Sequence, residues 1–196
     1  MRYKKLCDIA EIKFCTVSPS RAKQQNEPSK WLACANFLAD NIVSLNTSES
    51  FITPEREWLL QKDDIVIKRI TPTFINYIDS IPDNIYCGNN LIIVTVKDNM
   101  YPRYVAMILN NKIKSVSAES SVGAVMKSIS RSDIEVVEIP VLDTQQQILL
   151  GDFWFKGIEL SKKKTRLIEL ENIKRTYILK QYIHTLGGYK NGKNNF

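Results

Sequence analysis

Residues 143–186 read DTQQQILLGDFWFKGIELSKKKTRLIELENIKRTYILKQYIHTL, with no proline and only two internal glycines. Asp143 or Thr144 can cap the first turn by accepting hydrogen bonds from unpaired N–H groups, and Gly187 can adopt the left-handed conformation that ends many helices. A helix over this range would be roughly 60 Å long at about 1.5 Å per residue. Because a small domain is narrower than that, we expect the helix to project from a domain or to need a partner.

Apolar side chains in this segment recur at alternating spacings of three and four residues, which is typical of a coiled-coil stripe. The stripe predicts a dimer or partner interface, and it consists of Leu149, Phe153, Leu160, Leu167, Leu170 and Tyr177. Three lysines fall on the same stripe, namely Lys156, Lys163 and Lys174. A second apolar stripe lies beside it, formed by Ile148, Phe155, Ile158, Ile173, Leu179, Tyr182 and Ile183. We interpret the segment as a spacer or assembly helix; the alternative is an ordinary C-terminal helix folded over its own core.

The composition indicates one globular domain with an appendage. The chain has 196 residues, of which 44% are hydrophobic and 24% charged, so it can build a core of ordinary size. No apolar run reaches membrane-spanning length, and the N-terminus lacks the apolar stretch of a signal peptide. Four widely spaced cysteines without a Cys-x-x-Cys pair favour reduced thiols in a cytoplasmic protein.

The net charge is +6, and basic residues crowd the C-terminal half of the chain. This excess is compatible with nucleic-acid binding, although many globular proteins carry as much. Polar loops are the expected positions of binding residues, because loops present charge and amides from a rigid scaffold. A Ser- and Pro-rich segment over 16–30 is one such loop, with a plain solvated connector as the alternative. Other polar segments cover residues 71–77, the turn before residues 91–96, and residues 115–127, after a helix that starts near Pro102. Residues 91–96 are almost wholly apolar and β-branched, so we expect a fully buried strand there.

Residues that carry out catalysis are scarce in this sequence. A single histidine, His184, lies near the end of the long segment. With no second histidine and no clustered cysteines, the sequence lacks the residues for a zinc site, and His184 is poorly placed for a Ser/His/Asp triad. The seven glycines form no phosphate-binding loop, and the Asn/Asp-Pro-Pro-aromatic motif of amino-methyltransferases is absent. Glu11-Ile12-Lys13 matches only half of a common nuclease motif. We therefore predict no metal site and no enzymatic activity in this chain.

Several motifs, in order, resemble those of specificity (S) subunits of type I restriction-modification enzymes. Ile139-Pro140-Val141-Leu142-Asp143-Thr144-Gln145-Gln146-Gln147-Ile148 is similar to the family's Ile-Pro-x-Leu-Glu-Glu-Gln-x-x-Ile, which ends a target-recognition domain and enters a long helix. Leu60 to Ile67 resembles the family's Leu-x-Lys-Gly-Asp-Ile-Leu-Ile strand, with Asp63 in place of glycine. Tyr101-Pro102-Arg103-Tyr104 and the Trp31 to Asn36 segment add further similarity, so the resemblance covers nearly the whole chain.

The resemblance implies an α+β fold, in which a mixed, β-rich target-recognition domain (1–142) precedes a long C-terminal coiled-coil helix (143–188) and a tail (189–196). S subunits usually carry two recognition domains and two such helices, and this chain has one of each. It thus looks like a half subunit that dimerises, or pairs with a longer S subunit, to read a bipartite site on double-stranded DNA. Methyltransferase (M) subunits and a restriction (R) subunit would be its partners, and they would hold S-adenosylmethionine, ATP and Mg. A coiled-coil adaptor that never binds DNA is the alternative.

From loop composition we expect DNA contacts from four groups of polar side chains. They are Arg21, Lys23 and Lys30; Lys68, Arg69, Thr71, Thr73, Asn76 and Tyr77; Asn89 and Asn90; and Ser120, Ser121 and Lys127. Lys and Arg would neutralise phosphates, whereas amides, hydroxyls and Arg would read base edges in the major groove.

Overall fold

The computed structural model describes residues 2–16, 24–34, 47–52, 56–70, 73–81, 84–97, 99–119 and 128–191. The chain divides into two compact units, Met1–Lys156 and Gly157–Phe196. The first unit is a mixed, β-rich domain, and the long helix α4 (Thr144–Asn191) follows it in sequence, which confirms the predicted α+β class. The start of α4 belongs to the first unit, so the packing division falls later than the start of the helix.

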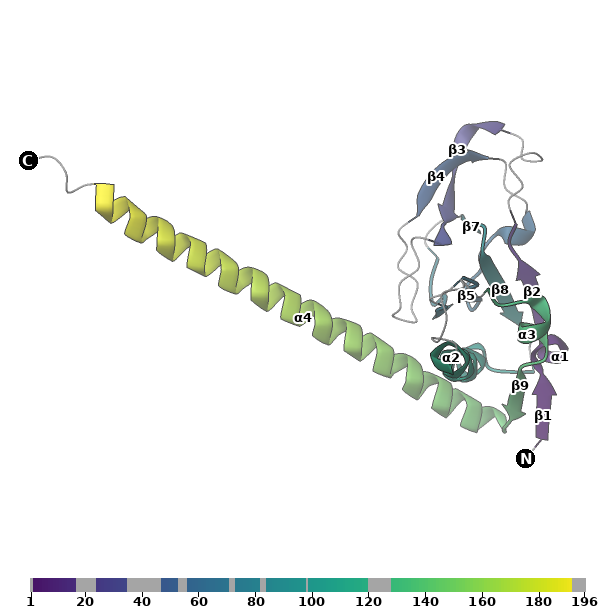
Figure 1. The fold of residues 1–196 in the computed structure, drawn as a ribbon. Coiled ribbons are helices and arrows are strands. Elements are labelled where there is room, and N and C mark those ends of the chain that lie inside the picture. The colour runs from purple at the N-terminus through teal and green to yellow at the C-terminus, as the bar shows by residue number, and fades with distance from the viewer. Residues whose placement is uncertain are drawn as a thin grey trace, which may run out of the picture. The chain divides into compact units, whose positions relative to one another are not determined.

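A four-stranded antiparallel sheet forms the centre of the first unit (Figure 1). Its order is β2 (Ala10–Phe14), β8 (Leu91–Val96), β5 (Ile65–Lys68) and β6 (Ile75–Tyr77). Successive side chains of a strand point to opposite faces, and in β8 both faces are apolar. A strand of this kind is stable only when both faces of its sheet are covered, as predicted for residues 91–96.

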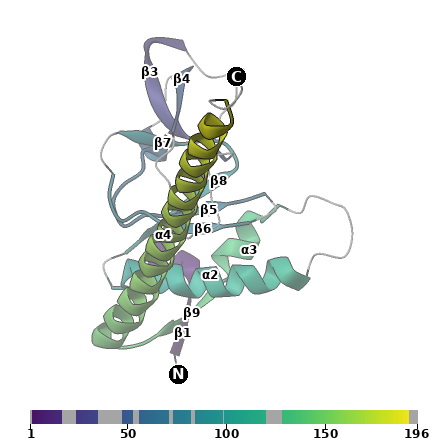
Figure 2. The same ribbon diagram turned by 90° about the vertical axis from the view of Figure 1, so that its left-hand side faces the viewer.

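The two faces of the sheet lead into two separate hydrophobic clusters. Ile92 and Val94 belong to the cluster that includes residues of α2 (Pro102–Glu119), which lies across one face of the sheet (Figure 2). Leu91 and Ile93 belong to the other cluster, which contains Trp31, Trp58 and Ile85. The Trp31 ring packs against Trp58 and Tyr86, with centroid distances of 6.2 and 5.7 Å.

The second cluster is built on a three-stranded sheet in the order β4 (Ser48–Ile52), β3 (Gln24–Leu32), β7 (Ile85–Cys87). The predicted loop over 16–30 is therefore wrong for residues 24–30, which belong to β3. Pairing with β4 and β7 supplies backbone hydrogen bonds that outweigh the local preference of Ser, Pro and Asn for loops. The register shifts between Gln24 and Ser29, and Pro28, which lacks an N–H, lies inside that irregularity.

Short elements complete the domain. β1 (Arg2–Lys5) pairs with β9 (Glu138–Val141), and α1 (Leu6–Ile9) connects β1 to β2. The 3-10 turn η2 (Arg56–Trp58) carries the buried Trp58. The helix α3 (Arg131–Glu135) starts with a capping box, in which the Ser130 side chain accepts from the Asp133 N–H and the Asp133 carboxylate accepts from the Ser130 N–H.

The helix predicted to start near Pro102 is confirmed as α2, but it continues to Glu119. The predicted loop over 115–127 is thus wrong for residues 115–119, because small polar residues can extend a helix that is already anchored by its buried face. Residues 120–127 lie outside the described part of the chain.

The helix α4 starts as predicted, since the Asp143 carboxylate accepts a hydrogen bond from the Gln146 N–H at 2.9 Å. Its predicted end at Gly187 is wrong, because the helix continues through Gly187 and Gly188 to Asn191. Glycine permits the left-handed conformation that ends a helix but does not impose it. The 48 residues correspond to about 70 Å of helix. Among the described residues, no helix combines the length and apolar character needed to cross a membrane.

Candidate nucleic-acid interface

One end of the central sheet brings together segments that are far apart in the sequence. β2 and β5 end there, and β6 and β8 begin there, because Phe14 lies opposite Ile92 and Lys68 lies opposite Leu91. The polar residues that follow β5 therefore lie beside the turn that precedes β8.

Backbone hydrogen bonds join these segments through Arg69. The Arg69 N–H donates to the Asn90 carbonyl at 2.9 Å, and the Ile129 N–H donates to the Arg69 carbonyl at 3.0 Å. The Arg69 side chain also donates, from Nε, to the Ile129 carbonyl at 2.9 Å. An isolated bridge between Ile70 and Ser128 continues the contact. Two of the predicted groups, Lys68 with Arg69 and Asn89 with Asn90, thus meet at one edge together with residues 128 and 129.

The turn at Asn89 and Asn90 is present as predicted. Asn90 has a φ of 64°, in the left-handed region that asparagine tolerates better than most residues. Its N–H donates to the Asn89 side-chain oxygen at 2.8 Å, and Asn89 is exposed. The side-chain nitrogen of Asn89 remains available as a donor to a ligand, since that bond uses only the oxygen.

Two aromatic rings hold the cations of this edge in place. The Phe14 ring has the Arg69 guanidinium at 5.8 Å and the Arg131 guanidinium at 4.7 Å from its centroid. Lys68 Nζ lies 5.3 Å from the Phe74 centroid. Cation–π contacts order long side chains without neutralising them. Arg131 also pairs with Glu135 at 3.2 Å, so part of its charge is already balanced.

Sequence reasoning missed Phe14 and Arg131. Phe14 ends the strand β2, and Arg131 is the first residue of the short helix α3. Only the contact between β2 and the segment around α3 places them together, and no local pattern signals it.

Two of the predicted loop residues are instead interior. Asn76 and Tyr77 lie in β6 with 0% and 3% of their surface exposed, so their assignment to a DNA-contacting loop is wrong. The Tyr77 hydroxyl donates to the Asp63 carboxylate, and burial raises the pKa of Tyr77. Thr73 is half-buried just before Phe74. The short strand was missed because its pairing with β5 is a tertiary contact, whereas its composition is that of a loop.

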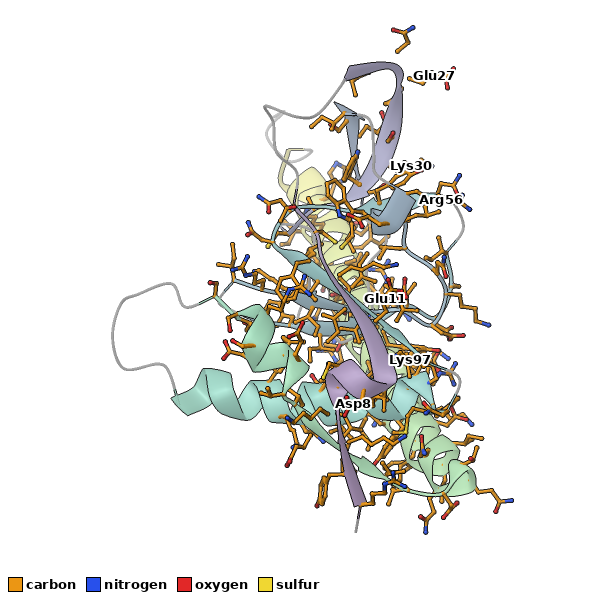
Figure 3. The ribbon with its side chains drawn as sticks, turned by 90° about the vertical axis from the view of Figure 1, so that its right-hand side faces the viewer. Asp8, Glu11, Glu27, Lys30, Arg56 and Lys97 are labelled. Atoms are coloured by element: carbon orange, nitrogen blue, oxygen red, sulfur yellow. The ribbon has the colours of Figure 1, made fainter. Side chains whose placement is uncertain are left out.

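Lys30 lies elsewhere, on β3. Figure 3 shows Lys30 on a face that also carries labelled acids and bases, and the exposed residues there are Asp8, Glu11, Glu27, Arg56 and Lys97. Acids and bases alternate on this face, so it does not present the uniform positive charge that favours phosphates. The other predicted contacts, Arg21, Lys23, Thr71, Ser120, Ser121 and Lys127, lie outside the described residues.

The predicted stripe on α4 is exposed. Its six members, Leu149, Phe153, Leu160, Leu167, Leu170 and Tyr177, show between 47% and 79% of their surface. In the second stripe, Phe155 is buried at 3% and packs edge-on against Tyr77 at 5.3 Å, whereas Ile173, Leu179 and Tyr182 are exposed. Apolar patches of this extent mark interaction surfaces. Within the described ranges, no cluster of His, Cys, Asp and Glu could hold a metal ion.

Comparison with known proteins identifies the family. The family described as "Type I restriction modification DNA specificity domain" matches residues 1–172. None of the curated proteins compared with the chain matches it.

Solved structures share the fold at low sequence identity. The HsdS subunit from Thermoanaerobacter tengcongensis has a TM-score of 0.57 and 16% identity, covering 83% of this chain and 39% of that chain. The type I restriction-modification S subunit from M. genitalium has a TM-score of 0.53 and 14% identity, covering 83% and 41%. A chain from a structure of type I R-M complex assembly and conformational transition has a TM-score of 0.55 and 13% identity, covering 92% and 43%.

This chain spans less than half the length of each of these solved chains. The comparisons give no support to the alternative of a coiled-coil adaptor. The family match extends through the domain and into the long helix, and the chain belongs to the type I restriction-modification DNA specificity domain family.

Proposed function

We propose that this chain reads one half of a bipartite DNA site and pairs through α4 with a second copy, and that the assembly directs methyltransferase and restriction subunits to the site. Specificity subunits of the family are non-catalytic in type I systems. The observation that carries the proposal is the edge of the central sheet where Lys68, Arg69, Asn89 and Asn90 meet.

The chemistry of this edge suits duplex DNA. Lys68 and Arg69 supply positive charge for phosphates, and an Arg guanidinium can also bind both acceptors of guanine in the major groove. The exposed Asn89 amide is a reader of adenine, to which Asn donates and from which it accepts. Because the backbone bonds through Arg69 fix these groups relative to each other, their spacing is preorganised before DNA binds.

A gel-shift titration tests the DNA proposal. Replacing Lys68 and Arg69 by Ala should weaken binding and reduce the slope of log K against log salt by about 0.9 for each phosphate that is no longer neutralised. Arg56→Ala, on the face of mixed charge, is the matched control and should change neither affinity nor slope. The Lys68 ammonium contacts the Phe74 ring and takes no part in the hydrogen bonds of Arg69. The single change Lys68→Ala therefore tests the loss of charge while the Arg69 hydrogen bonds are kept. Unchanged affinity in both variants would remove this edge from the interface.

The lysines of the α4 stripe favour an antiparallel helix pair. In a parallel pair in register, each of Lys156, Lys163 and Lys174 would face its own copy, and like charges repel. In the antiparallel register that sets Phe153 opposite Leu170, every lysine of the stripe instead meets a leucine. The pairs are Lys156 with Leu167, Lys163 with Leu160, and Lys174 with Leu149. The aliphatic stem of each lysine then covers apolar surface while its charge stays in water.

Neighbouring substitutions on α4 test the pairing. Leu167→Glu, on the stripe, should convert the dimer to a monomer in sedimentation velocity at micromolar concentration. Ile168→Glu, next to it and off the stripe, should leave the dimer intact; both side chains are 58% exposed. A wild-type protein that sediments as a monomer at this concentration would rule out the homodimer.

The helix pair would act as a ruler between the two half-sites. Inserting seven residues after Lys164, or roughly two helical turns, keeps the phase of the stripe and lengthens the helix by about 10 Å. DNA rises about 3.4 Å per base pair, so the spacer in the recognised site should lengthen by about three base pairs. Methylome sequencing of cells that carry the methyltransferase subunits reads this spacer, and an unchanged spacer would exclude the ruler. S-adenosylmethionine, ATP and Mg belong, in this proposal, to the partner subunits.

A further inference from the structure

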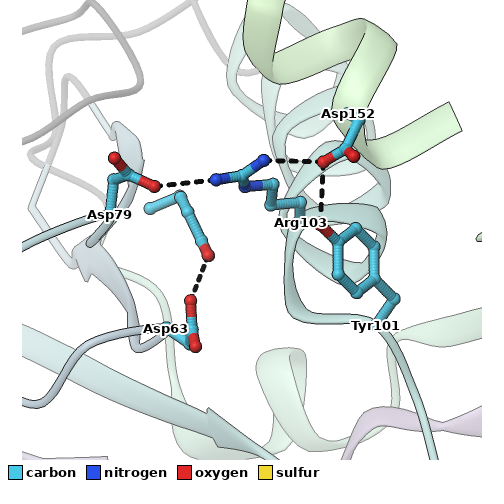
Figure 4. Close-up of polar contacts among 6 residues, drawn as sticks. Asp63, Asp79, Tyr101, Arg103 and Asp152 are labelled. Atoms are coloured by element: carbon cyan, nitrogen blue, oxygen red, sulfur yellow. Dashed lines mark hydrogen bonds and ion pairs between the residues drawn. The ribbon is translucent and has the colours of Figure 1, made fainter. Parts of the chain in front are cut away.

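The start of α4 is attached to the domain by an ion-pair cluster centred on Arg103. This residue lies in the first turn of α2 and pairs with Asp152 of α4 at 2.6 Å and with Asp79, which follows β6, at 2.8 Å (Figure 4). The Tyr101 hydroxyl donates to the same Asp152 oxygen at 2.7 Å. One guanidinium therefore joins three separate elements of the domain.

The planar face of the Arg103 guanidinium is also covered by rings. Its central carbon lies 4.2 Å from the Phe155 centroid and 5.5 Å from the Tyr77 centroid. The Tyr101 hydrogen bond, followed by the Arg103 charge, holds the pKa of Asp152 below its ordinary value. A fork of donors and a flat stacking surface are properties of Arg that Lys cannot reproduce.

Further contacts hold the same turns of α4. The buried Gln147 side chain accepts from the Tyr101 N–H at 2.9 Å and donates to the Leu142 carbonyl at 2.8 Å. At Gly151, a Cβ would lie 2.6 Å from the Tyr104 nitrogen, so only glycine allows this approach of α4 to α2. All these residues precede Gly157, and they lie within the first compact unit.

We propose that Arg103 and Asp152 are positioning residues that fix the direction in which α4 leaves the domain, and through it the half-site spacing that the assembled subunit accepts. The second part rests on the proposed function. Helix length alone sets a spacing only if each domain is attached to its helix at a constant angle. Within the first compact unit, the Arg103 cluster joins the first turns of α4 to α2 and to Asp79, so it can hold the helix at such an angle where the helix leaves the domain.

The first measurement does not depend on DNA. Spin labels are attached at the exposed Cys7 and at Glu171→Cys in a Cys34→Ser background, in which Cys15 and Cys87 remain buried. Pulsed electron resonance then reports the distribution of distances between domain and helix. Arg103→Gln should broaden this distribution, and Arg103→Lys should broaden it as well, because Lys keeps the charge but has neither the fork nor the stacking surface. Arg166→Gln removes an exposed Arg–Glu pair within α4 and should leave the distribution unchanged.

The second measurement is spacer selectivity. Duplexes with the same half-sites and different spacers compete for the subunit assembled with its methyltransferase partners. Arg103→Gln should lower the preference for the best spacer over its neighbours about tenfold, with affinity for a single half-site retained. Circular dichroism confirms that the variant is folded, and Asp152→Asn, which keeps the side-chain volume, replaces it if it is not.

The outcomes separate the two proposals. Distributions of equal width in wild type and in both Arg103 variants overturn the positioning role. A broadened distribution with unchanged spacer preference overturns its link to half-site spacing. If the Arg103 variants broaden the distribution but the wild-type protein binds no DNA, the attachment role is supported and the proposed function is overturned.

Discussion

Gly151 and Gly157 of α4 occupy opposite environments, and substitution by alanine should change the stability in opposite directions at the two positions. A Cβ added at Gly151 would lie 2.6 Å from the Tyr104 nitrogen and 3.0 Å from the Arg103 carbonyl carbon. A Cβ added at Gly157 would meet nothing within 4 Å. Both positions are helical, so alanine gains the same intrinsic helix propensity at each, about 1 kcal/mol.

The balance at Gly151 is unfavourable. The clashing atoms belong to the backbone of α2 and cannot rotate away, so either α4 or α2 must shift. Forcing an extra carbon into a packed contact costs about 1–3 kcal/mol. A shift would also strain the Arg103–Asp152 pair at 2.6 Å and the Tyr101–Asp152 bond at 2.7 Å. The 2.6 Å approach to a backbone nitrogen puts the cost at the upper end of this range. We therefore expect Gly151→Ala to lower the free energy of unfolding by about 2 kcal/mol once the propensity gain is subtracted.

Thermal unfolding followed by circular dichroism measures the difference. For a chain of this size, each kcal/mol shifts the Tm by about 2–4 °C. Gly151→Ala should therefore lower the Tm by several degrees, whereas Gly157→Ala should not lower it and should strengthen the helical signal. A Gly151→Ala variant as stable as the wild type would refute the close approach of α4 to α2, and with it the packing described for the domain–helix attachment.

Three further predictions concern the domain. The pKa of Asp152 is held below its ordinary value of 3.8, so its carboxylate stabilises the fold above that pH. This contribution is lost as the pH falls through the folded-state pKa. Asp152→Asn should therefore make the free energy of unfolding, measured by urea denaturation, fall less steeply at acid pH, and an unchanged pH dependence would contradict this. Asn90→Gly should keep the turn before β8, because glycine adopts a positive φ without strain. Asn90→Val should lower the free energy of unfolding by about 1–2 kcal/mol, because valine is strained at this φ. Equal stability of the two variants would show that residue 90 does not keep its positive φ. Ser130→Ala removes the cap of α3 and should lower the free energy of unfolding by about 1 kcal/mol in the same denaturation experiment. Ser132→Ala is the control and should lower it by less.

Local patterns were sufficient for the elements whose signals lie within a few residues. The period of apolar residues and the Asp143 cap predicted α4, Pro102 predicted the start of α2, and the apolar run predicted β8 as a strand covered on both faces. The family resemblance also rests on such short motifs, and the family match confirms it. Residues 24–30 and 75–77 were placed in loops, because strands of polar composition form only when distant partners, β4 and β5, supply hydrogen bonds.

The sequence by itself determined a β-rich domain, a long helix with an apolar stripe, and the family to which they belong. Tertiary structure alone decided which polar residues meet: Lys68 and Arg69 beside Asn89 and Asn90 at one sheet edge, Asn76 and Tyr77 in the interior, and Arg103 against Asp152 at the start of α4. The reason is that helix caps and periodicity act between near neighbours in the chain, whereas strand order and ion pairs depend on contacts between residues that are tens of positions apart.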